Sequence, residues 1–166
     1  HLPRLDYAFF IADNEDPAQL FSSGLHNFLE FIKKTKDNFE KESHKDRPRI
    51  VLVSSVNLYQ QKLSHFERIL KNAEIRFAKY IKEAKLNGRI VRLAGVYGPR
   101  MHFRIDDPVV NLIKLSIQEK LNEESDSTQF SSRDLYVDDV VKLLVKSALV
   151  SGTAHKIYDG ALLSPV

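Results

Sequence analysis

Apolar residues gather along the chain in short runs that alternate with longer stretches of helical spacing. Three runs have the length of strands that are covered on both faces, at residues 5–12, 50–55 and 89–98. A short closing strand is expected at residues 155–160. Helices are expected at about residues 18–41, 64–86, 107–121 and 137–150. This alternation predicts an α/β fold, in which helices pack on the faces of a mostly parallel sheet of three to four strands.

The second expected helix has the clearest pattern. Its apolar stripe consists of Phe66, Leu70, Ala73, Phe77 and Ile81. Asn87 and Gly88 follow it, and we expect Gly88 to end the helix because glycine tolerates left-handed backbone geometry.

Composition narrows the class of protein. The chain has 166 residues, of which 43% are hydrophobic and 28% charged, with a net charge of +3 and no cysteine. These values fit one globular domain without disulfides. No apolar run is long enough for a membrane span and no secretory leader opens the chain, so we expect a soluble, cytoplasmic protein.

Two kinds of site are not expected. Basic residues are scattered among acids, without the stripe and interleaved aromatics of a nucleic-acid surface. The histidines lie on different expected elements without helical pairing, so no metal site is predicted.

In open parallel sheets, ligands bind beyond the carboxyl ends of the strands. Those ends carry Ala12, Ser54 with Ser55, and residues 95–100. The glycine-rich fingerprint that cradles a dinucleotide pyrophosphate is absent from the chain.

Four stretches together resemble one enzyme family. "IVLVSSVNLY", "AE" at Ala73 and Glu74, "RLAGVYGPRM" and "RDLYVDDVV" follow the order seen in NAD-dependent epimerase/dehydratases. These are the extended short-chain dehydrogenases that act on nucleotide sugars, and "YGPRMHFRIDDPVV" looks most like their UDP-glucuronate decarboxylase branch. The resemblance runs from Leu5 to about Ser164 and corresponds to the middle of a family member.

The resemblance implies a partial Rossmann-like three-layer fold over residues 1–166, with about four helices, that lacks the glycine-rich first half. It implies NAD as cofactor, near Ala12, Ser54 and Leu93, although we do not expect this chain alone to bind it. Arg100 and Arg133 match arginines that meet the nucleotide phosphates in the family.

The family's catalytic residues match unevenly. Ser55, four residues before Tyr59, stands in the place of the catalytic Ser/Thr. Counting back from Glu74, the family's tyrosine falls at Phe66 and its lysine at Leu70. Phenylalanine has no proton to transfer, and leucine has no charge to tune one.

Other departures agree with a loss of chemistry. A register one residue later places Glu67 and Lys71 at these positions and still lacks the tyrosine. In the family a glycine follows the tyrosine that corresponds to Tyr59, and this chain has Gln60 there. The asparagine often found on the family's third strand is replaced by Gly95. Tyr59 and Tyr80 are the remaining phenols nearby, and Tyr59 belongs to the serine turn itself.

Structural explanations stand beside the functional ones. Phe66 and Leu70 are four residues apart on an apolar stripe, as in ordinary core packing. Ser54 and Ser55 could satisfy strand-end amides. Asp138 and Asp139 begin a helix, where carboxylates favour the positive end of the dipole.

We therefore expect a degenerate or truncated epimerase/dehydratase-like domain with a structural or binding role. The alternative is a fragment of an active NAD-dependent enzyme whose cofactor-binding half lies outside this chain. In the family's sheet, the strand at Asp6–Ala12 pairs with a strand that this chain lacks. We expect that edge to be covered by a second copy or by another polypeptide.

Overall fold

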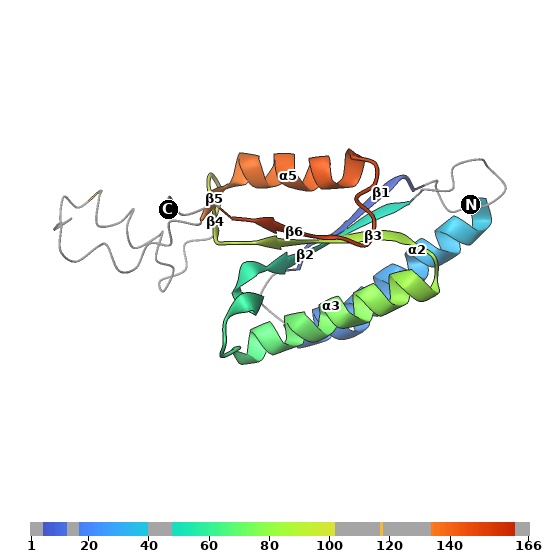
Figure 1. The fold of residues 1–166 in the computed structure, drawn as a ribbon, viewed down its shortest axis with the longest axis horizontal. Coiled ribbons are helices and arrows are strands. Elements are labelled where there is room, and N and C mark those ends of the chain that lie inside the picture. The colour runs from blue at the N-terminus through green and yellow to red at the C-terminus, as the bar shows by residue number, and fades with distance from the viewer. Residues whose placement is uncertain (1–4, 13–16, 40–47, 102–116, 118–133, 162–166) are drawn as a thin grey trace.

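The computed structural model describes residues 5–12, 17–39, 48–101, 117 and 134–161. Its main sheet has four parallel strands in the order β1–β2–β3–β6 (Figure 1). The strands are β1 (Tyr7–Phe10), β2 (Arg49–Ser55), β3 (Asn87–Leu93) and β6 (Ile157–Gly160). Each neighbouring pair is parallel, which confirms the predicted α/β class.

Helices cover both faces of this sheet, as Figure 1 shows. On one face lie α2 (Leu25–Phe39) and α3 (His65–Glu83), and on the other lies α5 (Val137–Leu149). The helix expected at 107–121 falls outside the described residues. None of the described helices combines the length and the hydrophobicity that a bilayer crossing requires.

The two central strands supply the core on both faces. Ile50 and Leu52 pack toward α2 and α3, whereas Val51 and Val91 pack toward α5. All four side chains are completely buried. The continuous apolar runs of the sequence therefore reflect strands that are covered on both sides.

β1 does not match the prediction of a strand covered on both faces. Phe9 is 38% exposed and Ile11, just past the strand, is 65% exposed. α5 packs on β2 and β3, and among the described residues no strand pairs with the outer side of β1. The apolar side chains of this edge therefore remain in contact with water.

The first predicted helix is present, with a π-helical turn near its start. It consists of α1 (Pro17–Gln19), the π-helical segment η1 (Leu20–Gly24) and then α2. The hydroxyls of Ser22 and Ser23 both donate to the carbonyl of Gln19, at 3.2 and 3.1 Å. Such serine bonds compete with the helix ladder, and they coincide with the irregular turn.

α3 begins with a capping box. The Glu67 amide donates to Ser64 Oγ at 3.2 Å, and the Ser64 amide donates to Glu67 Oε2 at 2.6 Å. This start agrees with the predicted helix boundary.

The end of α3 differs from the prediction. The left-handed residue is Lys85, with φ of +50°, and not Gly88. The amide of Lys85 donates to the carbonyl of Lys82, and that of Leu86 donates to the carbonyl of Ile81. These bonds form a Schellman motif, with buried Leu86 as the residue that follows it.

Gly88 has a packing role inside β3. A Cβ at Gly88 would lie 2.8 Å from Ile81 Cδ1 and 2.9 Å from Phe77 Cζ. Glycine is needed there because α3 presses directly on the strand.

The third predicted strand is divided. After β3 the chain forms β4 (Val96–Tyr97), which pairs with β5 (Leu135–Tyr136) in a small parallel sheet. The sequence analysis did not predict β5, because a two-residue strand leaves no periodic signal.

The cap of α3 generates the first prediction. Lys85→Gly should increase the free energy of unfolding by about 1 kcal/mol, because glycine adopts the left-handed conformation without a Cβ penalty. Lys79→Gly, in the exposed middle of the same helix, should decrease it by about 1 kcal/mol. Urea denaturation measures both. Equal destabilisation by the two substitutions would contradict the assigned cap.

Candidate functional site

The candidate site lies at the carboxyl ends of β2 and β3. Ser55 ends β2 and is paired in register with Leu93, which ends β3. Ala12 lies just after β1 and packs against the core on the α2–α3 side. Leu93 is buried on the α5 side, so the three predicted cofactor positions Ala12, Ser54 and Leu93 do not share one face.

The two serines have different environments. Ser55 is half-buried, and its Oγ accepts a hydrogen bond of 3.1 Å from the amide of Asn57. It thereby caps the short 3-10 helix η2 (Val56–Tyr59). Ser54 is 6% exposed, and its Oγ is buried without a hydrogen-bond partner. The expectation that these serines satisfy strand-end amides is therefore confirmed for Ser55 and wrong for Ser54.

Phe66 and Leu70, at the positions of the family's tyrosine and lysine, are part of the core. Leu70 is 2% exposed and belongs to the cluster between α3, η1 and the sheet. The Phe66 ring packs edge-on against Phe21 of η1, with the ring centroids 6.3 Å apart. These contacts agree with the core-packing explanation.

An ion pair links α3 to β3 one turn further along the helix. Arg92 Nη2 donates to Glu74 Oε2 at 2.7 Å, and Arg92 Nε donates to Glu74 Oε1 at 3.0 Å. The side chains are only 14% and 7% exposed. This bidentate bond is the main cause that raises the pKa of Arg92 above its already high ordinary value.

Arg92 also contacts a phenol. Its guanidinium carbon lies 4.6 Å from the ring centroid of Tyr59, as in a cation–π interaction. The Tyr59 hydroxyl lies 3.0 Å from each carboxylate oxygen of Asp159 and donates to that group. Glu74, Arg92, Tyr59 and Asp159 therefore form one polar chain, which we call the Arg92 cluster.

Gly95 lies in close contact with a carboxylate. A Cβ at this position would lie 2.4 Å from Asp134 Oδ1. Asp134 is 9% exposed, so it has little freedom to move away. An asparagine, the family's residue at this point, would require Asp134 to be displaced.

The remaining predicted residues do not join the cluster. Arg100 is exposed in a turn, with φ of +67°, and Arg133 lies outside the described residues. Asp138 and Asp139 occupy the first turn of α5, as the helix-dipole explanation requires. Tyr80, the other phenol considered, donates to Glu30 and thereby lowers the pKa of that carboxyl.

Sequence reasoning missed Arg92 and Asp159. A charged residue inside the apolar run "RIVRLAG" was a signal that the side chain needs a buried partner. The buried partner is Glu74, 18 residues away on α3. The rest of the cluster was not visible, because Tyr59 and Asp159 are 100 residues apart in the chain.

The Arg92 cluster generates the second prediction. Arg92→Leu should lower the free energy of unfolding by about 3 kcal/mol, because it leaves the carboxylate of Glu74 buried without its partner. The double substitution Glu74→Leu/Arg92→Leu should recover most of that loss. Tyr59→Phe is the matched control and should cost about 1 kcal/mol, because its phenol is exposed. Urea denaturation of the four proteins tests the pair, and a double variant as unstable as Arg92→Leu would contradict it.

Comparisons with known proteins match this chain only through its fold. No protein-family model matches the sequence, and no curated protein matches it. Among solved structures, RMD from Pseudomonas aeruginosa complexed with NADPH is 14% identical, with a TM-score of 0.68 over 94% of this chain and 60% of its own. The epimerase Mth375 from Methanothermobacter thermautotrophicus is 13% identical, with a TM-score of 0.70 over 94% of this chain and 51% of its own.

The name of a third similar structure includes a nucleotide sugar. UDP-glucuronic acid 4-epimerase from Bacillus cereus, in complex with NAD, is 16% identical, with a TM-score of 0.58 over 96% of this chain and 55% of its own. The present chain thus spans about half to three-fifths of the length of these proteins. It has the Rossmann-type fold of these three structures, over the part of that fold that it covers.

Proposed function

We propose that this chain is a degenerate nucleotide-sugar epimerase/dehydratase-like domain that performs no catalysis of its own and acts as a structural or binding module. The observation that carries the proposal is the packing of Phe66 and Leu70. One ring rests on Phe21, and the other side chain is 2% exposed in the core. Neither side chain can donate, accept or tune a proton.

The neighbouring polar groups support the same proposal. Ser55 Oγ caps η2, and the Tyr59 hydroxyl is held by Asp159. The carboxylate of Asp134 lies where a side chain at position 95 would extend. These groups already have structural partners within the chain, so a relay of protons to a sugar would first have to break those contacts.

A second candidate is a fragment of an active NAD-dependent nucleotide-sugar enzyme, completed by a cofactor-binding half outside this chain. Two observations favour it: the similar structures hold NAD or NADPH, and they are considerably longer than this chain. The unpartnered hydroxyl of Ser54 also lies at the carboxyl edge, where a ligand could satisfy it.

The third prediction tests whether this chain alone binds the cofactor or carries out the chemistry. The purified chain should show no rise in melting temperature with NAD or UDP-glucuronate and no formation of reduced cofactor from the two together. A ligand present at a hundred times its dissociation constant would stabilise the protein by about 2.7 kcal/mol, which is readily detected. Cofactor reduction that is lost in Ser55→Ala but kept in Lys79→Ala would contradict the proposal, because it would show catalysis by this chain alone.

We also propose that the outer side of β1 is covered by a strand from a second copy of the chain. Phe9 and Ile11 are exposed on this edge, and a sheet edge of apolar residues is a template for pairing with another strand. The backbone groups of Phe9 point away from β2, because ladder bonds of a parallel pair alternate from the bond between Arg49 N and Asp6 O.

The fourth prediction concerns this edge. Light scattering should give a dimer at tens of micromolar, and Phe9→Lys should shift the equilibrium toward monomer, because an edge lysine opposes strand addition. Phe31→Lys, on the exposed side of α2, is the matched control and should leave the dimer intact. A parent chain that remains monomeric would contradict self-association and leave another polypeptide as the partner to be sought.

A further inference from the structure

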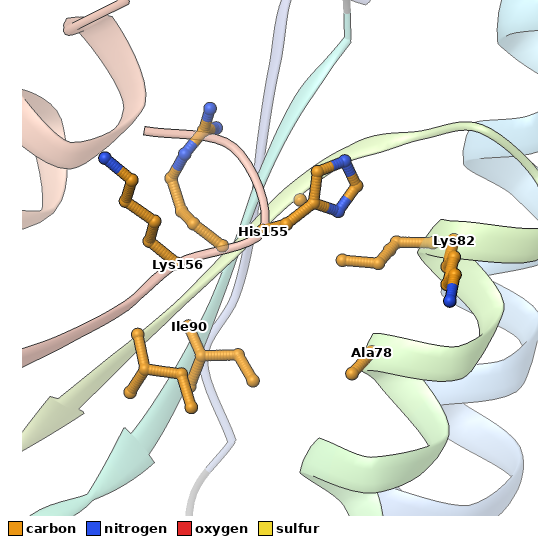
Figure 2. Close-up of a pocket in the computed structure, with 9 residues that line it drawn as sticks. Ala78, Lys82, Ile90, His155 and Lys156 are labelled. Atoms are coloured by element: carbon orange, nitrogen blue, oxygen red, sulfur yellow. The ribbon is translucent and has the colours of Figure 1, made fainter. Parts of the chain in front are cut away.

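A cavity lies at the amino ends of the strands, whereas the candidate site lies at their carboxyl ends. It has a volume of about 390 Å³ and lies between the second half of α3 and the starts of β3 and β6. Ala78 and Ile81 of α3 form one wall, and Ile90 with Ile157 of the strands form the other. Figure 2 shows Ala78 and Ile90 facing each other across the opening.

The topology explains why there is open space here. Over β3 there is no free space at Gly88, because α3 packs so closely there that even a methyl group would collide with Ile81. The situation at β6 is different. α5, which connects to β6, lies on the other face of the sheet, so among the described elements no helix covers β6 on the α3 side. Ile157 is consequently 49% exposed.

Basic side chains surround this apolar space. Lys82 comes from α3, whereas His155 precedes β6, so the two basic groups come from both sides of the opening (Figure 2). No acidic residue is among the described residues that line the cavity. Arg89 and Lys156 also contribute to the wall, but they alternate with Ile90 and Ile157 toward the α5 face and are not counted here.

The combination of shape and charge defines a ligand class. Sites for small molecules are typically clefts of about 300–1,000 Å³ with mostly apolar walls and a few polar groups that fix orientation. An apolar body would bury its surface against Ala78, Ile90 and Ile157. Its anionic head would then lie between Lys82, whose positive charge attracts it, and the His155 ring.

We propose that this cavity binds a small amphiphilic carboxylate, with its hydrocarbon part between α3 and the strands and its head group at the basic rim. The site lies at the amino ends of the strands and does not depend on the proposed loss of catalysis. It uses none of the residues of the Arg92 cluster.

Calorimetric titration of the full chain with decanoate, decanol and decylamine tests the proposal, with every ligand kept below its micelle concentration. Decanoate should bind saturably at one site per chain, and decanol and decylamine should each bind at least about tenfold more weakly. Equal binding of the three ligands, or no saturable decanoate binding, would overturn the assignment.

Three variants locate the site. Lys82→Glu should weaken decanoate by about tenfold or more and leave decanol unchanged, because it reverses one charge at the rim. Ala78→Phe should abolish binding of both ligands, because its ring fills the apolar space. Lys79→Glu makes the same charge change next to the wall but outside the cavity, and it should leave decanoate unchanged.

Two results for these variants would be decisive against the site. An equal loss in Lys79→Glu and Lys82→Glu would attribute the affinity to net charge. Unaltered binding in an Ala78→Phe protein with the parent's melting temperature would place the ligand elsewhere. Self-association that depends on Ala78 without decanoate binding would identify the cavity as a protein contact and would also overturn the proposal.

Discussion

The seven-residue parallel ladder between β2 and β3 is the constraint on which the rest of the structure depends. It pairs Arg49 with Asn87 at one end and Ser55 with Leu93 at the other, so it defines both edges of the sheet. The alternate residues of these strands fill two separate cores. Because a shift by one residue would turn every buried side chain to the opposite face, the register is strongly specified. The Arg92 cluster lies at the carboxyl ends of the strands and the basic-rimmed cavity at their amino ends, and both depend on that register.

Most of the main sheet could be predicted from the sequence, because its strands and helices have local signals. The apolar runs located β1, β2 and β3, and helical spacing located α3 and α5. The errors arose where a distant contact decides the local structure. Gly88 was assigned to a helix end because of its type, but its position is explained by the side chain of Ile81 pressing on it. Similarly, the exposure of Phe9 depends on which strand lies beside β1, and no local pattern contains that information.

The candidate site was less predictable for the same physical reason. Counting from Glu74 places Phe66 and Leu70 where the resemblance implies a phenol and an ammonium. The groups that occupy the edge instead come from four separate elements. Arg92 satisfies Glu74 and packs on Tyr59, which in turn binds Asp159. Such a chain of contacts is assembled by the fold and has no spacing that could be read along the sequence.

Core packing and catalysis are competing uses of the same face of α3. A lysine in the environment of Leu70 would bury its ammonium among apolar groups, which is costly without a partner. Leucine there instead contributes about 1.5–3 kcal/mol from burial of its side chain. Phe21 of η1 packs against Phe66, so part of this ring is buried against the core. One turn after Leu70, the buried carboxylate of Glu74 is held by Arg92. Each of these contacts stabilises α3 on the sheet, and each commits a position of this helix to packing or to an internal ion pair.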